Sequence, residues 1–148
     1  MADDTVVVRV ESSPREGDLV QRVEARHHTI LADEPIGTGD DLGATPYELL
    51  LAALGTCTSM TLWMYARHKG IALEHVGVRL TYNRVYVEDC QADEEGDAKK
   101  RRVHRIERDI SLLGDMSDAD RQRLLEIAER CPVHRTLEEE KEIVTRLV

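Results

Sequence analysis

The spacing of apolar positions changes along this 148-residue chain, and the changes predict strands and helices in turn. β-branched residues over Thr5–Val10 predict a first strand, and Leu19–Leu31 predicts one or two more after a turn over Pro14–Gly17. The segment Glu34–Ala44 holds three glycines and one proline, a composition typical of a loop. The first third of the chain is therefore expected to be a small strand-rich region.

A long helix is predicted to follow, from Thr45 to about Lys69. Thr45 supplies a capping hydroxyl, Pro46 occupies the first helical position and Glu48 the third, while Gly70 suits a C-terminal stop. The stripe expected to face the core comprises Leu50, Leu54, Cys57, Thr61 and Met64, with Ala53 and Met60 beside it. Because the other faces between residues 49 and 57 are also apolar, we expect a central helix that is buried on all sides.

The second half of the chain returns to alternation. Apolar residues at every second position from Val76 to Tyr82 predict a half-buried strand, and Ile106, Ile110 and Leu112 repeat the pattern. Between them, the charged segment Asp89–Arg102 is expected to be an exposed connection.

A second helix is predicted to begin at Ser117, with Asp120 at the reciprocal capping position. Its apolar stripe comprises Leu124, Ile127, Ala128 and Cys131. Pro132 ends or kinks this helix at Cys131, and Ile143–Val148 is expected to form a short closing strand. The order of elements predicts an α+β fold with largely antiparallel pairing, in a single domain over residues 1–148.

Composition and charge limit the expected partners and the expected cellular location. The net charge of −9 repels phosphate backbones and anionic lipids, so neither nucleic acid nor a membrane is an expected partner. The acidic N-terminus lacks the features of a signal peptide, and the longest apolar run, Leu49–Leu54, is too short to span a bilayer. Three cysteines do not make a secreted disulfide framework, so we expect a cytoplasmic protein.

Cys57 and Cys131 are the candidate chemical groups, because each lies on the apolar stripe of its predicted helix. Two small core residues would fit the same pattern, since free cysteine is among the most buried residue types. There is no CxxC motif, and Pro132 interrupts the CxxH spacing of Cys131 and His134. His27 and His28 are adjacent on a predicted strand and point to opposite faces, so no metal or other cofactor is expected.

Two segments carry a resemblance to a known family. The run ADEPIGTGDDLGATPYELLLAALGTCTSMTLWMYARHKGIALEHVGV at residues 32–78, followed by IAERCPVHRTL at 127–137, resembles the OsmC/Ohr family of hydroperoxide reductases. The resemblance covers roughly residues 20–148. It implies an OsmC-like fold, with antiparallel sheets around a long central helix in an intertwined homodimer.

The resemblance also implies roles for individual residues. Cys57 matches the peroxidatic cysteine and Cys131 the resolving one, while Glu48 matches a glutamate that orients an arginine over the reactive thiolate. That arginine is expected from the N-terminal strands, where Arg22 and Arg26 are both available and Arg22 is favoured.

The surroundings of the two cysteines agree with unequal roles. Cys57 lies about twelve positions inside a helix, where the macrodipole contributes little and apolar neighbours raise the pKa of its thiol. A reactive thiolate there needs a cation. Cys131 is expected at a helix C-terminus, where the partial negative charge disfavours a thiolate.

The position of Glu48 sets a geometric requirement. Glu48 and Cys57 are nine residues apart on one helix, about 13 Å along its axis and roughly half a turn around it. They cannot share a site within one chain, so a second subunit would have to supply Glu48.

The expected activity is the reduction of organic hydroperoxides in an antioxidant stress response. An external dithiol, which the resemblance implies to be of lipoyl type, would reduce the resulting disulfide. Cys90 has no counterpart in the family pattern. Two alternatives stay open: a catalytically idle dimer that binds an apolar ligand, and a thiol–disulfide exchange enzyme.

Overall fold

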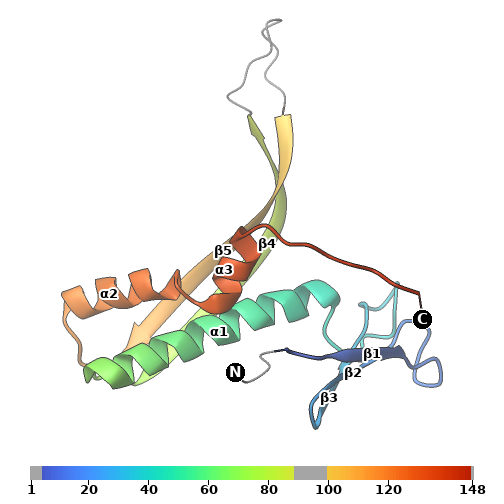
Figure 1. The fold of residues 1–148 in the computed structure, drawn as a ribbon, viewed down its shortest axis with the longest axis horizontal. Coiled ribbons are helices and arrows are strands. Elements are labelled where there is room, and N and C mark those ends of the chain that lie inside the picture. Colours follow the sequence, from blue (N-terminus) through green and yellow to red (C-terminus); the bar gives the residue numbers. More distant parts are fainter. Residues whose placement is uncertain (1–4, 89–99, 148) are drawn as a thin grey trace, which may run out of the picture. The chain divides into compact units, whose positions relative to one another are not determined.

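The computed structural model describes residues 5–88 and 100–147 (Figure 1). The elements in chain order are β1 (Arg9–Ser12), β2 (Gln21–Ala25), β3 (His28–Ala32), α1 (Pro46–Lys69), β4 (His75–Glu88), β5 (Lys100–Leu113), α2 (Asp118–Ala128) and α3 (Pro132–Glu138). The predicted α+β class, with antiparallel sheets and one long helix, is confirmed. Contacts divide the chain into two compact units, Met1–Leu50 and Leu51–Val148.

The first unit contains an antiparallel sheet in the order β1-β2-β3. The prediction of a strand over Thr5–Val10 is wrong in its bounds, because β1 begins only at Arg9. In the ladder between β1 and β2, Arg9 pairs with Glu24 and Ser12 with Gln21, so the paired part of the first strand is Arg9–Ser12. β-branched residues favour a strand only where a neighbouring strand accepts their hydrogen bonds.

The loop predicted over Glu34–Ala44 is confirmed, and Asp33 organises it. The carboxylate of Asp33 is buried and accepts backbone N–H groups from Glu34 at 2.8 Å and from Asp40 and Leu42 at 3.1 Å each. The hydrogen bond from Leu42, followed by those from Glu34 and Asp40, lowers the pKa of this carboxyl, against the opposing effect of burial. One side chain thus satisfies three amides of an otherwise irregular segment.

Helix α1 begins and ends where local signals predicted. Thr45 N–H donates to Glu48 Oε2 at 2.7 Å and Glu48 N–H donates to Thr45 Oγ1 at 3.2 Å, which completes a capping box. Gly70 follows Lys69 with φ of +66°, the left-handed conformation that commonly stops a helix.

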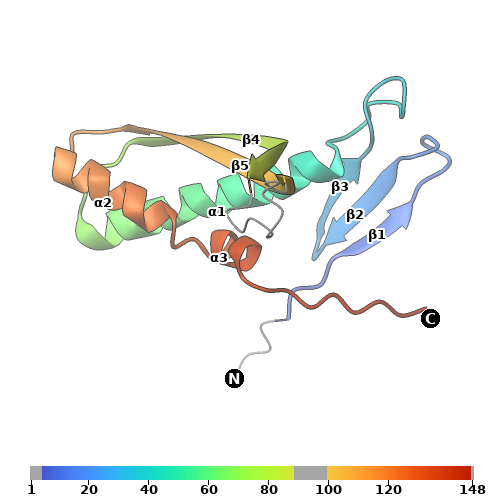
Figure 2. The same ribbon diagram turned by 90° about the horizontal axis from the view of Figure 1, so that it is seen from above.

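The second unit packs α1 and α2 against the β4–β5 hairpin, and α2 runs beside the C-terminal half of α1 (Figures 1 and 2). The buried core comprises Leu62, Ala66, Leu73, Leu124, Ile127 and Ala128. Gly55 lets α1 approach the hairpin closely, since a Cβ there would lie 2.8 Å from Leu80 Cδ1. The two strands pair in register from His75 opposite Leu113 to Glu88 opposite Lys100. Lys100–Arg102, predicted as part of an exposed connection, therefore belong to a strand, and 89–99 lie outside the described residues.

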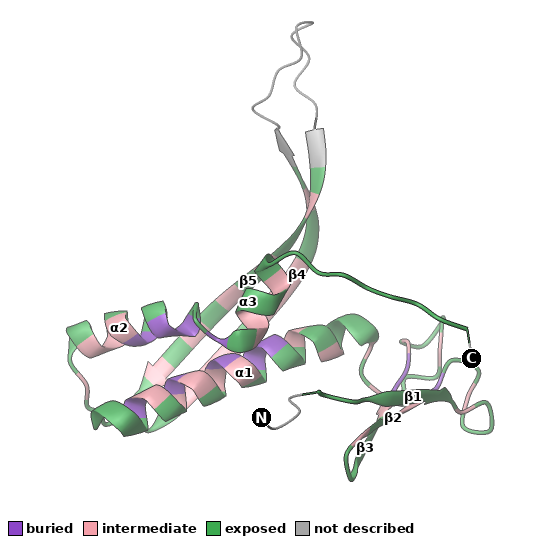
Figure 3. Ribbon diagram, viewed as in Figure 1, coloured by how far each residue is buried: buried purple, intermediate pink, exposed green. Residues whose placement is uncertain are grey.

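The expectation that α1 is buried on all sides is wrong for the single chain. Its buried residues are Leu54, Gly55, Thr58, Leu62 and Ala66, which form one face (Figure 3). Met60 and Met64, which were placed on or beside the core stripe, are 64% and 72% exposed. A helix that is apolar on every side carries no pattern that tells which side meets the core, so only packing decides it.

The C-terminal part confirms the second helix and corrects the segment after it. Ser117 and Asp120 form the predicted capping box at the start of α2. The predicted stripe from Leu124 to Cys131 is buried throughout. The expected closing strand is wrong over 143–147, which has no regular structure, and Ile143 and Leu147 are exposed.

Among the described residues, α1 is the helix that is long and apolar enough to cross a membrane by length and composition. The run Leu49–Leu54 by itself is too short to span a bilayer, but the apolar character continues along the rest of α1. Core helices of soluble proteins meet the same criterion, so the observation is weak evidence for a membrane span. The packing of Leu62 and Ala66 in the core of the second unit favours a core helix.

Candidate active site

The fold brings Cys57 and Cys131 together although 74 positions separate them in sequence. Cys57 lies on α1 and is half-buried, whereas Cys131 lies between α2 and α3 and has no exposed surface. Their thiols are within hydrogen-bonding reach of each other, and both cysteines are free. Two thiols placed in this way are able to close a disulfide after one of them is oxidised.

The pKa of the Cys57 thiol is raised, chiefly because burial disfavours the thiolate. The neighbouring Cys131 raises it further, while the Val133 backbone and the Thr61 hydroxyl act in the opposite direction through hydrogen bonds. The predicted direction of the shift is therefore confirmed. Within the chain, these hydrogen bonds do not offset the cost of burying a negative charge.

The expectation that Cys131 lies at a helix C-terminus is corrected. Helix α2 ends at Ala128, and Cys131 is the N-cap of α3, where its Sγ accepts the His134 N–H at 3.3 Å. Pro132 makes this possible, because it disfavours helical geometry at Cys131 and suits the first position of the next helix. The sulfur thus faces an amide donor.

Sequence reasoning missed two residues beside Cys131. Thr58, on the turn of α1 next to Cys57, is completely buried, and its Oγ1 lies 3.9 Å from Cys131 Sγ. Arg108 on β5 donates from Nη1 to the same Oγ1 at 2.9 Å. The signal was present in the strand pattern, since Arg108 occupies an apolar-face position between Ile106 and Ile110.

The three remaining predicted residues are Glu48, Arg22 and Arg26. Glu48 is exposed, and its hydrogen bonds from the Thr45 backbone and hydroxyl lower the pKa of its carboxyl. Arg22 on β2 pairs with Glu16 at 2.9 Å, and Arg26 lies in the β2–β3 turn with φ of +58°. The roles of Glu48 and Arg22 at the thiolate therefore stay predictions. Cys90 lies outside the described residues.

A pocket of about 290 Å³ opens next to this cluster within the second unit. Its lining combines apolar, basic and acidic side chains: Leu54, His104, Ile106, Arg108, His134, Leu137 and Glu138. His134 Nε2 lies 3.0 Å from Glu138 Oε2, and His104 Nδ1 lies 2.6 Å from Tyr82 Oη. Over 5–88 and 100–147, no three His, Cys, Asp or Glu side chains gather closely enough to hold a metal ion.

The comparison with protein families decides where the chain belongs. The model of the OsmC-like proteins matches residues 37–146, a span that includes both cysteines and more than half of the chain. The chain belongs to the OsmC-like family. No curated protein matches it significantly.

Solved structures agree with this OsmC-like assignment at the level of the fold. An OsmC-like protein from Mycoplasma pneumoniae is 20% identical with a TM-score of 0.69, covering 92% of this chain and 89% of that one. An organic hydroperoxide resistance protein OsmC from Legionella pneumophila is 18% identical with a TM-score of 0.59, covering 93% and 91%. A third, from Vibrio cholerae, is described as a putative organic hydroperoxide resistance protein with captopril bound in one of its active sites. It is 15% identical with a TM-score of 0.59, covering 93% and 86%. The predicted OsmC-like fold is confirmed.

Proposed function

We propose that this OsmC-like protein reduces organic hydroperoxides, with Cys57 as the peroxidatic thiol and Cys131 as the resolving thiol. The observation that carries the proposal is the proximity of one half-buried and one fully buried thiol, drawn from distant parts of the chain. Structural relatives described as organic hydroperoxide resistance proteins support the same reaction class.

The proposed cycle has three steps. The Cys57 thiolate attacks the O–O bond of the hydroperoxide, which forms a sulfenic acid and releases an alkoxide that takes up a proton to become the alcohol. Cys131 then attacks the Cys57 sulfur, the S–S bond forms, and the sulfenic oxygen leaves as water. An external dithiol, for which we propose a lipoyl-type group, reduces the disulfide and is itself oxidised. The reaction needs no bound cofactor, and we place it in the cytoplasm.

The first step requires a cation near Cys57. Burial raises the pKa of this thiol, so little thiolate exists at neutral pH without a neighbouring positive charge. In the proposed mechanism Arg22 supplies that charge, and Glu48 holds the arginine in place. Because Glu48 lies about 13 Å along α1 from Cys57, it acts on the thiol of a second subunit.

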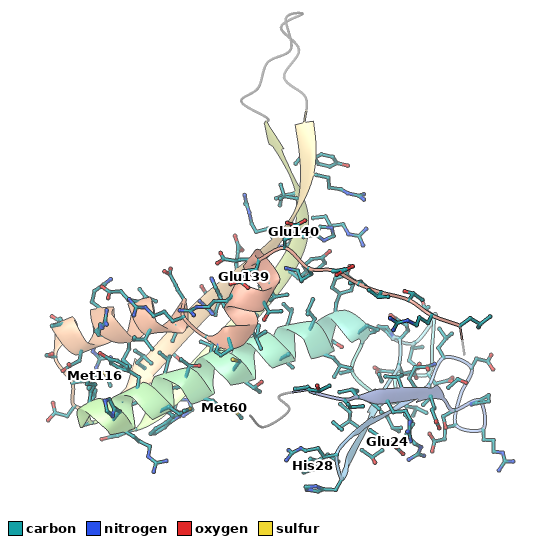
Figure 4. The ribbon with its side chains drawn as sticks, viewed as in Figure 1. Glu24, His28, Met60, Met116, Glu139 and Glu140 are labelled. Atoms are coloured by element: carbon teal, nitrogen blue, oxygen red, sulfur yellow. The ribbon has the colours of Figure 1, made fainter. Side chains whose placement is uncertain are left out.

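We expect the protein to be a homodimer that does not dissociate without unfolding. Ala53, Met60 and Met64 leave an apolar strip of α1 exposed in the single chain, on the helix that carries Cys57 (Figure 4 labels Met60). A second copy is the proposed cover, and the proposed mechanism requires that it supply Glu48 to this Cys57. Sedimentation at micromolar concentration should give one species of twice the chain mass. A folded monomer would contradict the dimer and the proposed role of Glu48.

The proposed function is tested by titrating the reduced protein with cumene hydroperoxide. One equivalent should be consumed per chain, with loss of the Cys57 and Cys131 thiols and formation of one disulfide, measured by mass spectrometry of peptides. Hydrogen peroxide is expected to react more slowly, because Leu54, Ile106 and Leu137 give the neighbouring pocket an apolar part that suits an alkyl group. If the thiols stay reduced in excess hydroperoxide, the peroxidase proposal fails.

A further inference from the structure

Arg108 is a charged residue beside the two cysteines that the proposed peroxidase cycle does not use. It lies on β5 with Ile106 and Ile110 on the same face, and its side chain is half-buried. Across the described part of the chain, no carboxylate lies within ion-pairing distance of its guanidinium, and its hydrogen bond goes to Thr58. A guanidinium that donates to a hydroxyl strengthens that hydroxyl as a donor towards a negative charge.

Thr58 connects the guanidinium to a reacting atom. Its single hydroxyl hydrogen has two acceptors within reach, the Leu54 carbonyl oxygen at 2.8 Å and Cys131 Sγ at 3.9 Å. While Cys131 is a thiol, the carbonyl is the better acceptor and takes the hydrogen. A thiolate is a stronger acceptor, and the donation from Arg108 polarises the hydroxyl towards it.

The unequal burial of the two cysteines determines when Cys131 becomes a thiolate. Cys57 is half-buried and Cys131 is fully buried, so the thiolate of a reductant reaches the Cys57 sulfur of the disulfide. Attack there forms a reductant–Cys57 bond, breaks the Cys57–Cys131 bond and expels Cys131 with the electron pair. The second thiol of the reductant then releases Cys57.

We propose that Arg108, acting through the Thr58 hydroxyl, stabilises the Cys131 thiolate that leaves when a dithiol opens the Cys57–Cys131 disulfide. Thr58 touches the reacting sulfur, whereas Arg108 is a positioning residue that orients and polarises Thr58. The inference rests on the proposed function, because it requires that the two cysteines form the working disulfide. The inference gives Arg108 on β5 a role in the reduction of the disulfide. This role is separate from that of the cation that activates Cys57.

The experiment measures disulfide reduction without any hydroperoxide. The protein, residues 1–148, is oxidised with diamide, and its reduction by dithiothreitol is followed by trapping free thiols and counting them by mass spectrometry. Arg108→Met should slow reduction tenfold or more, which corresponds to about 1.4 kcal/mol in the barrier. The matched control is Arg105→Met on the same strand, an exposed arginine outside the cluster, which should reduce at the unmodified rate.

Variants of Thr58 distinguish the proposed action of Arg108 through the Thr58 hydroxyl from a general loss of structure. Thr58→Val should slow reduction as Arg108→Met does, Thr58→Ser should keep the rate, and Arg108→Lys should recover part of it. Because both residues act through one hydroxyl, the Arg108→Met/Thr58→Val double variant should be no slower than the slower single variant. An unchanged rate in Arg108→Met, or additive losses in the double variant, would overturn the inference.

The proposed function is tested separately, in the unmodified protein. Oxidation of its Cys57 by cumene hydroperoxide does not involve Cys131 as a leaving group, so this measurement is independent of the proposed role of Arg108. A protein that does not react with hydroperoxide but shows Arg108-dependent disulfide reduction would refute the peroxidase proposal and support the proposed role of Arg108. A protein that consumes hydroperoxide, but whose disulfide is reduced at the same rate with and without Arg108, would support the peroxidase proposal and refute the role of Arg108.

Discussion

Replacing Cys57 with serine is expected to abolish hydroperoxide reduction, because a serine hydroxyl does not form the nucleophilic anion that attacks the O–O bond. Replacing Cys131 with serine should allow one oxidation per chain and then stall, because the thiol that neighbours Cys57 and is proposed to condense with the sulfenic acid has been removed. A dimedone adduct on Cys57, detected by mass spectrometry, should therefore accumulate in Cys131→Ser and not in the unmodified protein.

The third cysteine is the control for this pair. Cys90 has no counterpart in the family's motifs, so Cys90→Ser should leave turnover nearly unchanged. Equal losses of activity in all three variants would remove the two-cysteine assignment. A Cys131→Ser protein that still turned over with dithiothreitol would show instead that the external thiol resolves the sulfenic acid directly.

The Glu48→Gln variant is expected to separate the structural role of this residue from its catalytic role. The capping box needs only an acceptor for the Thr45 N–H at 2.7 Å, and the glutamine amide oxygen supplies one. The cost in stability should be limited to the charge–dipole interaction, about 0.3–1 kcal/mol. The melting temperature should therefore stay close to that of the unmodified protein.

Activity in the same variant should fall by tenfold or more, about 1.4 kcal/mol of barrier for each factor of ten. The reason is that a neutral amide no longer anchors the arginine proposed to hold the Cys57 thiolate. Burial already raises the pKa of Cys57, so loss of the cation should move it higher still. The rate of Cys57 alkylation by iodoacetamide should accordingly rise at higher pH in Glu48→Gln than in the unmodified protein. If activity and alkylation were both unchanged, Glu48 would be a helix cap alone.

The candidate site was only partly accessible from the sequence. The motifs around Cys57 and Cys131 identified both thiols, and the structure places them together. Thr58 gives no signal on its own helix. Arg108 interrupts the apolar face of β5, but its contact with Thr58 joins positions 50 residues apart, which the sequence does not show. The N-cap position of Cys131 was also missed, since the seven-residue helix α3 after Pro132 has too short a pattern to recognise.

Local signals in the sequence determined the starts of α1 and α2 and the end of α1. The Thr45–Glu48 and Ser117–Asp120 capping boxes and the Gly70 stop each act within one turn of backbone, so neighbouring residues suffice to specify them. The alternation of β4 and β5 was likewise readable, because burial of one sheet face imposes a period of two.

Tertiary structure alone decided the features that depend on distant partners. The first strand is defined by its pairing with β2, which runs from Arg9 opposite Glu24 to Ser12 opposite Gln21, and its own β propensity does not set these bounds. The buried face of α1 runs through Thr58 and Leu62 and excludes Met60 and Met64, because α2 and the hairpin cover only that side. Intrinsic propensity and periodicity describe what a segment can bury, whereas the elements packed against it select what it does bury.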